Sequence, residues 1–343
     1  MANTKSIDFS SIHDQTSFAK YKERLEEKHF PVFFSLSQIR RTFGIKRDEQ
    51  EKYFGKNKRL LYRTRFISKR NGTLRRIDSP TQKLKSIQRF INKEILSKIN
   101  TNQCLTSFKK GTSIVDNAKP HTSKYCVASY DIKDYFPSIH YNQIFKIFYS
   151  VGYNVSVSHL LTKLCIGPNG CLPQGSPASP AISNIVGTHL DKRLSELCVK
   201  NNISYTRYAD DLSFSANFDL KRYHSLINHI IKDEGFCPNE KKYKIRYSFQ
   251  RQAVTGLIVN KKISANKELS KEISSAIRFI NKYGLNQHLE YIQCLDKDKY
   301  MHHLYGIAEY IKMVDLNKGL TLIRQLNRIF EKYDLPREIP SIS

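Results

Sequence analysis

The sequence predicts an α+β protein in which antiparallel strand pairs precede a helical C-terminal part. Asn71-Gly72 is a strong signal for a two-residue turn, and short β-rich runs lie on both sides of it. Residues 203–208 and 212–216 are two further strand-like runs, and only a very tight turn can join them. After Asn260, apolar residues recur at spacings of three and four, which is typical of helices.

The N-terminal residues predict helices followed by one hairpin. Residues 1–60 are basic and carry apolar side chains at helical spacing. Residues 62–67 and 73–77 are expected to form the two strands of the hairpin. The apolar residues between Leu84 and Ile95 then predict an amphipathic helix.

The central residues predict a sheet whose strands alternate with helices. Residues 125–130 read as a strand that ends at Asp131, and residues 203–216 read as a hairpin with Asp210-Asp211 at its tip. Helices are expected over residues 183–199 and 220–234, and another strand pair around residues 254–259.

The C-terminal residues predict helices only. Leu269, Ile273, Ile277 and Ile280 form one apolar stripe, and Gly284 supplies a stop signal after it. A second stripe runs from residue 320 to residue 330. Residues 260–265 are the most plausible boundary before this helical part.

Composition favours a nucleic-acid partner. The 343 residues carry a net charge of +26, a charge that repels itself unless polyanions neutralise it. The excess is uneven, because residues 40–100 hold 19 Lys and Arg against 5 Asp and Glu, whereas residues 260–343 hold 14 against 10. We therefore expect the nucleic-acid backbone to run mainly over the N-terminal third.

Other features exclude membrane and secreted classes. No apolar run approaches the ~18 residues of a transmembrane helix, and the first ten residues form no apolar signal core. The seven cysteines are scattered and form no C-x-x-C pair, which argues against disulfides and zinc and favours a reduced cytoplasm. We expect no contact with a membrane.

Three aspartates are the strongest chemical signal. Asp131 ends one strand, and Asp210 and Asp211 lie in a hairpin turn about 80 residues later. Carboxylates that gather in one place repel, and divalent cations relieve that repulsion. Oxygen ligands suit Mg²⁺, and two such ions can activate a hydroxyl and stabilise a pyrophosphate leaving group. The alternative is that Asp210-Asp211 only form a turn.

The sequence around these aspartates resembles reverse transcriptases. Residues 129–136, Ser-Tyr-Asp-Ile-Lys-Asp-Tyr-Phe, are similar to the first catalytic motif of that family. Residues 172–177, Leu-Pro-Gln-Gly-Ser-Pro, resemble its nucleotide-pocket motif, and Tyr208-Ala209-Asp210-Asp211 resembles its catalytic hairpin. The three motifs occur in the family's order and at its spacing. The resemblance implies a right-hand polymerase fold with fingers, an antiparallel-sheet palm and a helical thumb.

Two further elements resemble the retron branch of bacterial reverse transcriptases. Residues 117–121 match its Asn-Ala-x-x-His element, and Val254-Thr255-Gly256 matches its Val-Thr-Gly element. The resemblance covers residues 62–260, with residues 69–77 similar to the fingers hairpin. Gly235-Phe236, Asn239 and Lys242 are similar to the motif that follows the catalytic hairpin. The expected parts are a helical basic region (1–60), fingers with part of the palm (61–124), the palm (125–260) and the thumb (261–343).

The resemblance implies the catalytic and metal-binding residues. Asp131, Asp210 and Asp211 would be the catalytic aspartates and would ligate two Mg²⁺ ions, with the Ile132 carbonyl as a neutral ligand. Asp211 would be a looser ligand or an electrostatic partner. Phe136 would form an aromatic wall that excludes a ribose 2′-hydroxyl, and its alternative role is ordinary core packing.

The resemblance also implies a nucleotide site. Gln174 and Gly175 would contact the incoming dNTP, since glycine allows a close backbone approach. Lys69 and Arg75 would hold the triphosphate, and the alternative role of both is contact with a nucleic-acid backbone phosphate, an alternative that is stronger for Lys69 than for Arg75. Lys242 would protonate the pyrophosphate, or it is a solvated lysine in the run Lys241-Lys242.

The expected RNA or primer contacts are six residues from three elements. His121 would touch the template RNA, or it is a structural histidine whose hydrogen bonds are satisfied. Tyr208 would stack on or border the primer strand. The six residues are Asn117, His121, Tyr208, Val254, Thr255 and Gly256.

The retron resemblance implies a particular reaction. The enzyme would bind one structured non-coding RNA encoded beside it and copy part of it with dNTPs. It would prime from an internal guanosine 2′-hydroxyl and yield a branched RNA–DNA hybrid (msDNA). The family commonly serves in anti-phage defence with a separately encoded effector. The rivals are an intron-encoded (group II) or phage-exclusion (abortive-infection) reverse transcriptase, an RNA-dependent RNA polymerase, and a catalytically silent RNA-binding scaffold. Phe136 argues against the RNA polymerase, the short C-terminal region argues against the intron type, and the three aspartates argue against the scaffold.

Overall fold

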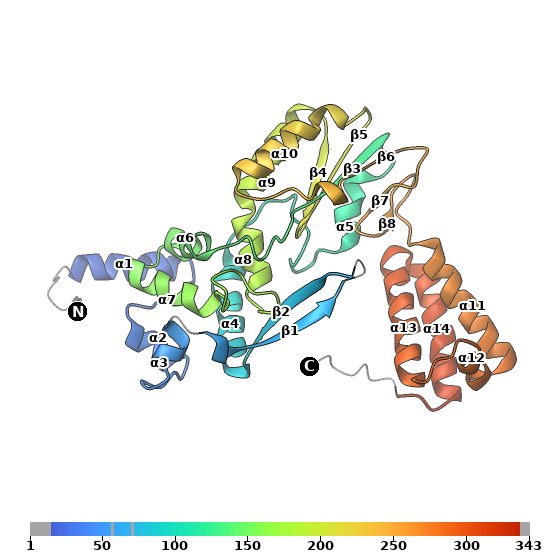
Figure 1. The fold of residues 1–343 in the computed structure, drawn as a ribbon, viewed down its shortest axis with the longest axis horizontal. Helices are drawn as coiled ribbons and strands as arrows, with labels where there is room; N and C mark the ends of the chain where they lie inside the picture. Colours follow the sequence, from blue (N-terminus) through green and yellow to red (C-terminus); the bar gives the residue numbers. More distant parts are fainter. Residues whose placement is uncertain (1–14, 56–57, 70–71, 337–343) are drawn as a thin grey trace. The chain divides into compact units, whose positions relative to one another are not determined.

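The structure is a computed structural model that describes residues 15–336, apart from residues 56–57 and 70–71. The described chain forms two compact units (Figure 1). The first comprises residues 15–102, 133–192 and 234–237, and the second comprises residues 103–132, 193–233 and 238–336. Both units therefore combine segments that are distant in the sequence.

The first unit combines helices with one antiparallel hairpin. Its strands are β1 (Tyr62–Ser68) and β2 (Leu74–Pro80), paired in a register that sets Arg65 opposite Ile77. This confirms the predicted hairpin strands, while Asn71 of the predicted turn lies outside the described residues. The helices are α1 (Gln15–Glu27), α2 (Leu36–Thr42), α3 (Gln50–Phe54), α4 (Gln82–Glu94), α6 (Tyr141–Val151), α7 (Val155–Cys165) and α8 (Ser179–Val186), with α9 (Thr188–Lys200) continuing into the second unit.

The second unit is built on a four-stranded antiparallel sheet in the order β4-β5-β3-β6. Its strands are β3 (Cys126–Asp131), β4 (Ser204–Tyr208), β5 (Asp211–Ala216) and β6 (Lys244–Tyr247). Side chains alternate between the two faces, so Tyr130, Leu212 and Phe214 are buried on one face, while Asp131 and Ser213 lie on the other. Helix α10 (His224–Asp233) lies along the apolar face, where His224 stacks on Tyr130 with ring centroids 5.7 Å apart.

Short elements cover part of the polar face of this sheet. Helix α5 (Ile114–Ala118) continues into the 3₁₀ turn η4 (Lys119–His121), and the 3₁₀ turn η6 (Glu240–Lys242) precedes β6. The two-residue strands β7 (Ala253–Val254) and β8 (Leu257–Ile258) form a small hairpin that packs on Ala118 and Val127. These elements leave the part of the polar face near Asp131 open.

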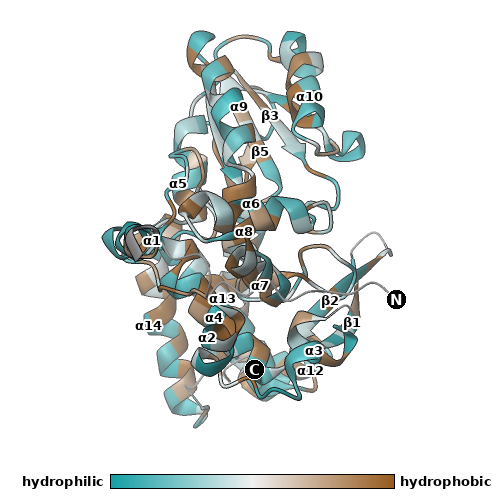
Figure 2. Ribbon diagram, turned by 90° about the vertical axis from the view of Figure 1, so that its left-hand side faces the viewer, coloured by the Kyte–Doolittle hydropathy of each residue, from teal (hydrophilic) through white to brown (hydrophobic). Residues whose placement is uncertain are grey.

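The helical C-terminal part has its own apolar core. It contains α11 (Lys267–Tyr283), α12 (Leu285–Tyr291), α13 (Lys297–Val314) and α14 (Leu316–Lys332). Ile277, Leu304 and Leu326 are among the buried residues that these helices share. Figure 2 shows the hydrophobic and hydrophilic residues alternating along α14, as expected for a helix with one apolar stripe. Gly284 ends α11 with a φ of +97°, which confirms the predicted stop signal.

Some elements differ from the sequence-based expectation. The single helix expected over residues 183–199 is two helices, because the first ends at Gly187. The helix expected from residue 220 begins as a 3₁₀ turn and becomes α-helical at His224. Strand β6 and helices α6 and α7 were not predicted at all.

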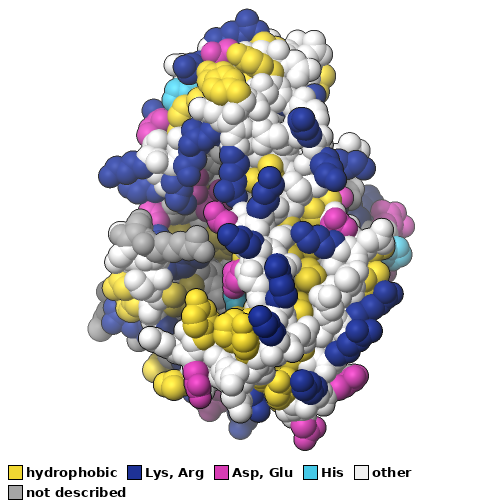
Figure 3. Space-filling view, turned by 90° about the vertical axis from the view of Figure 1, so that its right-hand side faces the viewer, with side chains coloured by type: hydrophobic (Ala, Val, Ile, Leu, Met, Phe, Trp, Pro, Cys, Tyr) yellow, Lys and Arg dark blue, Asp and Glu magenta, His cyan; other side chains and the backbone are white. Residues whose placement is uncertain are grey.

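Three properties of the described chain concern the molecule as a whole. Along the described parts of the chain, no helix combines the length and apolar character that crossing a bilayer requires. The seven cysteines are all free. On the face drawn in Figure 3, Lys and Arg side chains are spread widely and Asp and Glu side chains are fewer, in keeping with the net charge of +26.

Candidate active site

The three predicted aspartates meet at one end of the four-stranded sheet. Asp131 ends β3 and pairs directly opposite Asp211, the first residue of β5. Asp210 lies in the tight turn between β4 and β5. At the two ends of this turn, Tyr208 and Asp211 pair directly opposite each other. Asp131 is buried with 5% exposure, whereas Asp211 is exposed at the rim. Antiparallel pairing thus brings together carboxylates about 80 residues apart.

The turn that carries Asp210 is strained and held by hydrogen bonds. Ala209 has a φ of +57°, a conformation that L-residues rarely adopt. Its amide donates to Ser107 Oγ at 2.8 Å, and its carbonyl accepts from the buried Arg207 Nη1 at 3.2 Å. The Ile132 amide also donates to the Asp210 carbonyl at 3.0 Å. These contacts offset the strain and fix where the two aspartates lie.

Both carboxylate oxygens of Asp131 are hydrogen-bonded. Lys242 Nζ donates to Oδ2 at 2.6 Å, and Asn239 Nδ2 donates to Oδ1 at 2.8 Å. The Asn239 amide also donates to the Asp131 carbonyl at 2.8 Å. The Asp131 hydrogen bond raises the pKa of Lys242, with support from Asp210 and Asp211, so its ammonium stays protonated. Asp131 therefore has a protein counter-ion.

Desolvation and the neighbouring carboxylates affect the pKa of Asp211. Surrounding protein removes water from one side of this exposed residue, and that desolvation, together with Asp210 and Asp131, raises its pKa to about 6. Within the described residues, no three Asp, Glu, His or Cys side chains form a ready-made metal cluster. Yet facing carboxylates that raise one another's pKa are hard oxygen donors with excess negative charge, and this donor chemistry fits Mg²⁺.

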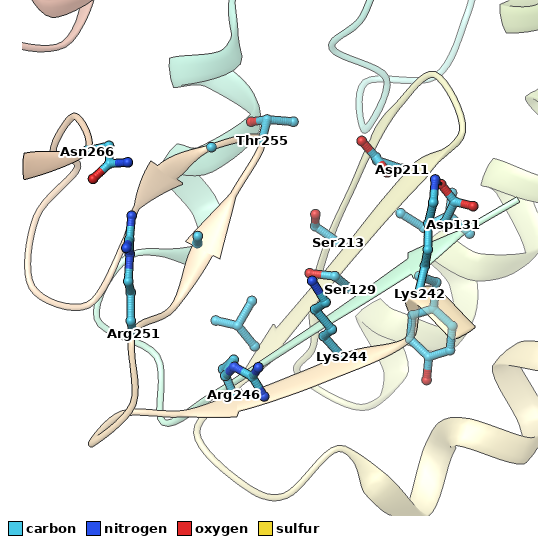
Figure 4. Close-up of a pocket in the computed structure, with 15 residues that line it drawn as sticks. Ser129, Asp131, Asp211, Ser213, Lys242, Lys244, Arg246, Arg251, Thr255 and Asn266 are labelled. Atoms are coloured by element: carbon cyan, nitrogen blue, oxygen red, sulfur yellow. Dashed lines mark hydrogen bonds and ion pairs between the residues drawn. The ribbon is translucent and has the colours of Figure 1, made fainter. Parts of the chain in front are cut away.

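A groove of about 580 Å³ extends from these carboxylates along the open face of the sheet (Figure 4). We call it the basic groove. One wall is made by β3, β5 and β6, and the other by the chain around β7 and β8. Its charged lining residues are Asp131, Asp211, Lys242, Lys244, Arg246 and Arg251.

The predicted RNA-binding elements form one buried network with the catalytic hairpin. His121 makes hydrogen bonds to Thr206 Oγ1 of β4 at 2.8 Å and to Ser215 Oγ of β5 at 2.7 Å. Asn117 accepts from Thr106 Oγ1 at 2.8 Å and donates to Thr255 Oγ1 at 3.3 Å. The Asn-Ala-x-x-His and Val-Thr-Gly elements are therefore joined to each other and to both strands of the hairpin.

This burial separates the six predicted RNA contacts into two groups. The side chains of Asn117, His121 and Val254 are at most 1% exposed, so we assign them a positioning role in place of the direct contact expected. Thr255 and Gly256 line the basic groove and remain available to a nucleic acid. Tyr208 is half-buried, and its ring lies 6.4 Å from that of the exposed Phe108.

The predicted nucleotide-binding residues other than Lys242 lie in the first unit. The Gln174 carbonyl accepts from the Asp78 amide of β2 at 2.7 Å, which fixes the residue 172–177 loop against the hairpin. Gly175 has a φ of +120°, and a Cβ there would lie 3.0 Å from the Asp78 carbonyl oxygen. Only glycine permits this close approach. Below the loop, the buried Gln88 accepts from Ser176 Oγ at 2.8 Å.

The other three predicted nucleotide-binding residues of this unit lie at separate places. Arg75 is exposed on β2, two residues before Ile77, against which Gly175 packs. Lys69 closes the end of the hairpin, where its amide donates to the Thr73 carbonyl at 2.7 Å. Phe136 is half-buried beside Tyr135, with ring centroids 6.1 Å apart, and so is only partly packed into the core.

Several residues of the site were not predicted from the sequence. Ser107 and Arg207 carry no recognisable local pattern, because their partner Ala209 is strained only in the folded hairpin. The signal for Lys244 and Arg246 was present: cations alternate with Tyr243, Ile245 and Tyr247 at a period of two. That alternation is typical of a strand with one charged face.

Comparisons with known proteins agree with these motifs. A family model described as "Reverse transcriptase (RNA-dependent DNA polymerase)" matches residues 67–290. The chain is 33% identical to the retron Ec86 reverse transcriptase of Escherichia coli over 263 residues, which are 76% of this chain and 78% of the relative. It is 31% identical to the retron Ec73 reverse transcriptase of the same species, over 73% of this chain and 82% of that one.

Two further matches were found. The retron Mx65 reverse transcriptase of Myxococcus xanthus is 30% identical, and the match covers 77% of this chain and 64% of that longer relative. A solved structure of telomerase from Candida albicans, in complex with a fragment of telomeric RNA, superposes with a TM-score of 0.46 at 13% identity. That match covers 79% of this chain and 63% of the telomerase chain.

The aspartate arrangement, the family model over more than half of the chain and the retron relatives point to one assignment. The antiparallel sheet and the helical C-terminal part are those of a right-hand polymerase fold. This chain belongs to the reverse transcriptases, RNA-directed DNA polymerases, and within them to the retron type.

Proposed function

We propose that this enzyme copies part of one structured non-coding RNA, encoded beside it, into single-stranded DNA. Synthesis starts from the 2′-hydroxyl of an internal guanosine and yields a branched RNA–DNA molecule (msDNA). The observation that carries the proposal is the pairing of Asp131 with Asp211 beside Asp210 at the mouth of an open basic groove. The hydrogen-bond network that joins both retron-type elements to this hairpin supports a reaction of the retron type.

The reaction is nucleotidyl transfer. A bond forms between the attacking hydroxyl oxygen and the α-phosphorus of a dNTP, and the bond from that phosphorus to the bridging oxygen breaks. Pyrophosphate leaves with the electron pair of the broken bond, and the hydroxyl loses its proton. Two Mg²⁺ ions, when bound, would favour hydroxyl deprotonation and neutralise charge on the leaving group.

The chain's own residues would align the substrates and neutralise charge around the reacting phosphate. Asp131 and Asp210 would hold both ions, with the Ile132 carbonyl as a neutral ligand and Asp211 as the looser partner. With a cation on Asp131, Lys242 would be free of this ion pair, and its Nζ would carry a proton that the departing pyrophosphate can accept. Arg75 and Lys69 bind the triphosphate, while Gln174 and Gly175 position the dNTP.

The proposed biological setting follows the family. The enzyme would work in the bacterial cytoplasm, where RNA and dNTPs are available, and would take part in anti-phage defence with a separately encoded effector. A catalytically silent RNA-binding scaffold is the alternative that the experiment below must exclude.

The test is to express the gene with its flanking DNA and analyse the nucleic acid that co-purifies. Asp210→Asn, alone or together with Asp211→Asn, should lower DNA synthesis at least about a hundredfold, because charge neutralisation at the reacting phosphate is lost. RNA should still co-purify. Asp298→Asn, an exposed position on α13, is the matched control and should make DNA normally.

The outcomes separate the possibilities. Short DNA covalently joined to RNA, present in wild type and absent in Asp210→Asn, supports the proposal. Undiminished synthesis by Asp210→Asn would refute the two-metal assignment. RNA without DNA from the wild type, together with inactivity on a homopolymer primer–template in Mg²⁺, would favour the scaffold.

A further inference from the structure

The basic groove contains a row of cations that leads away from the catalytic carboxylates. Lys242 contacts Asp131, Lys244 pairs with Ser129 of β3, and Arg246 pairs with Val127. Lys244 and Arg246 are two residues apart in β6, so they lie on the same face at an interval of about 6.6 Å, and Lys242 lies just before the strand in the 3₁₀ turn η6. Figure 4 shows Lys244 and Arg246 one after the other along β6, and Lys242 beside Asp131.

The opposite wall adds a fourth cation at a fixed place. Figure 4 shows Arg251 across the groove from Arg246, on the same side as Thr255. The buried Gln252 holds the two walls together, since its Nε2 lies within hydrogen-bond distance of the carbonyls of Tyr125, at 3.2 Å, and Arg246, at 3.1 Å. Arg251 is therefore held near Arg246 by the backbone on either side.

Three of these cations have no protein counter-ion. Over the part of the chain that the structure describes, neither Lys244 nor Arg246 nor Arg251 takes part in an ion pair, although Lys242 does. All three are exposed. Cations kept together without carboxylates repel one another, and such a site gains most when an anionic strand binds.

The proposed 2′ priming creates a need for such a site. An ordinary primer ends at its 3′-hydroxyl, so its last nucleotide has a phosphodiester on its 5′ side only. A nucleotide that attacks through its 2′-oxygen keeps both its 5′ and its 3′ phosphodiester. One more anionic strand must then leave the active site, over a surface that is open and positively charged.

We propose that Lys244, Arg246 and Arg251 bind the RNA phosphodiester on the 3′ side of the priming nucleotide, and that they thereby favour priming from a 2′-hydroxyl. The inference rests on the proposed function and adds residues that distinguish this reaction from extension of an ordinary primer. Lys242 and the aspartates serve both kinds of priming alike, because they act at the reacting phosphate.

The experiment compares intact and cut RNA. Once the priming nucleotide is known from the co-purified product, the RNA is assembled from two pieces cut directly after it, and the upstream piece ends in a 3′-deoxy nucleotide. Its 2′-hydroxyl is then the only nucleophile, and the 3′ phosphodiester is gone. The enzymes are wild type, Lys244→Gln, Arg246→Gln with Arg251→Gln, and Lys232→Gln on α10 as the control.

On intact RNA, the double variant should start DNA chains about tenfold more slowly than wild type or the control, as expected when charge-assisted contacts to a phosphate are lost. Lys244→Gln should show a smaller loss in the same direction. On cut RNA, all the enzymes should start chains at similar rates. Extension of a DNA oligonucleotide from its 3′-hydroxyl on the same template should be unchanged within about twofold, which also shows that the variants fold.

Two results would overturn the inference. Equal losses on intact RNA, on cut RNA and in oligonucleotide extension would mean that the groove binds nucleic acid generally. No loss on intact RNA would mean that these cations do not touch the strand. If wild type makes DNA from an oligonucleotide but no branched product on the intact RNA, the proposed function fails instead, and the inference fails with it.

Discussion

Burial fixes the charge of His121. Desolvation, with a small addition from Lys124, lowers its pKa to about 3, so the ring is neutral when it bridges Thr206 and Ser215. A neutral ring suits this place, because it exchanges hydrogen bonds with two hydroxyls and meets no carboxylate there. His121 thus clamps both strands of the catalytic hairpin without adding charge near the aspartates.

The depressed pKa of His121 predicts acid sensitivity. Between pH 6.5 and pH 3 the unfolded chain binds a proton at this histidine that the folded chain does not. The free energy of unfolding therefore decreases by about 1.4 kcal/mol per pH unit as the pH falls through this window. His121→Gln lacks this contribution, so its stability deficit relative to wild type should shrink by about 2 kcal/mol between pH 7 and pH 5.

Urea unfolding at each pH measures this difference. Ser225→Ala, at an exposed position on α10 without a titratable group, is the control and should keep the wild-type dependence on pH. A deficit of His121→Gln that stays constant from pH 7 to pH 5 would mean that His121 binds a proton in the folded protein as readily as in the unfolded chain.

Phe136 carries a prediction about sugar selectivity. Its half-buried ring leaves a surface free to meet a substrate. Phe136→Ala should narrow the preference for dNTPs over rNTPs by about tenfold or more, measured as the ratio of the two kcat/KM values, because a 2′-hydroxyl then has room. Phe145→Ala, in the stacked aromatic group of α6, should keep the preference. If Phe136→Ala leaves the preference for dNTPs over rNTPs unchanged, Phe136 serves only in core packing.

Residues at strand ends were predictable, whereas residues that meet only in the fold were not. Asp131 and Asp210 follow or interrupt clear strand patterns, so the sequence places them in one site. The partners of His121 lie 85 and 94 residues away, and no local pattern shows that its ring turns into the protein instead of toward RNA. The same holds for Ser107, whose contact with Ala209 spans 102 residues.

Among the elements, the loop at Gly175 packs closely against β2. Gly175→Ala would place a methyl group 3.0 Å from the Asp78 carbonyl oxygen and 3.1 Å from Ile77, at a φ that disfavours L-residues. The loop must then move off β2, and KM for dNTPs should rise about tenfold, with RNA binding unchanged. Steady-state kinetics at saturating template measures this effect.

Gly170 offers a matched control for this prediction. It also has a positive φ, +73°, but nothing lies within 4 Å of an added Cβ. Gly170→Ala therefore introduces backbone strain without a clash and should change KM little. Equal effects of the two variants would mean that strain matters and that the contact between the loop and β2 does not.

Element prediction succeeded where apolar patterning was strong and failed for β6. The hairpin of β4 and β5 and the stripe of α11 have many apolar residues at the right period. β6 is only four residues long and its groove face carries cations, so its alternation of charged and apolar residues is a weaker strand signal than apolar patterning. The sequence also could not give the break at Gly187, because a glycine with helical dihedral angles there leaves the apolar pattern almost intact.

At the scale of the whole molecule, the most prominent property is the net positive charge. A net charge of +26 predicts that binding of the cognate RNA weakens steeply with salt. If six to ten phosphates are neutralised, the affinity should fall by about 10³ to 10⁵ between 50 and 200 mM salt. A filter-binding titration over this range gives the slope, and a nearly flat slope would contradict recognition through phosphates.

The ion pair between Lys242 and Asp131 has a consequence for how the enzyme waits for its substrate. The lysine is a counter-ion tethered to the same chain, so the carboxylate of Asp131 is compensated within the protein itself. A magnesium ion that bound Asp131 would have to displace an ammonium group that cannot diffuse away. The proposed site would therefore favour a cation that arrives together with a nucleotide, because the triphosphate would offer the displaced lysine a new partner. On this proposal the order of binding would be set by the protein: metal and nucleotide together, and metal alone only weakly.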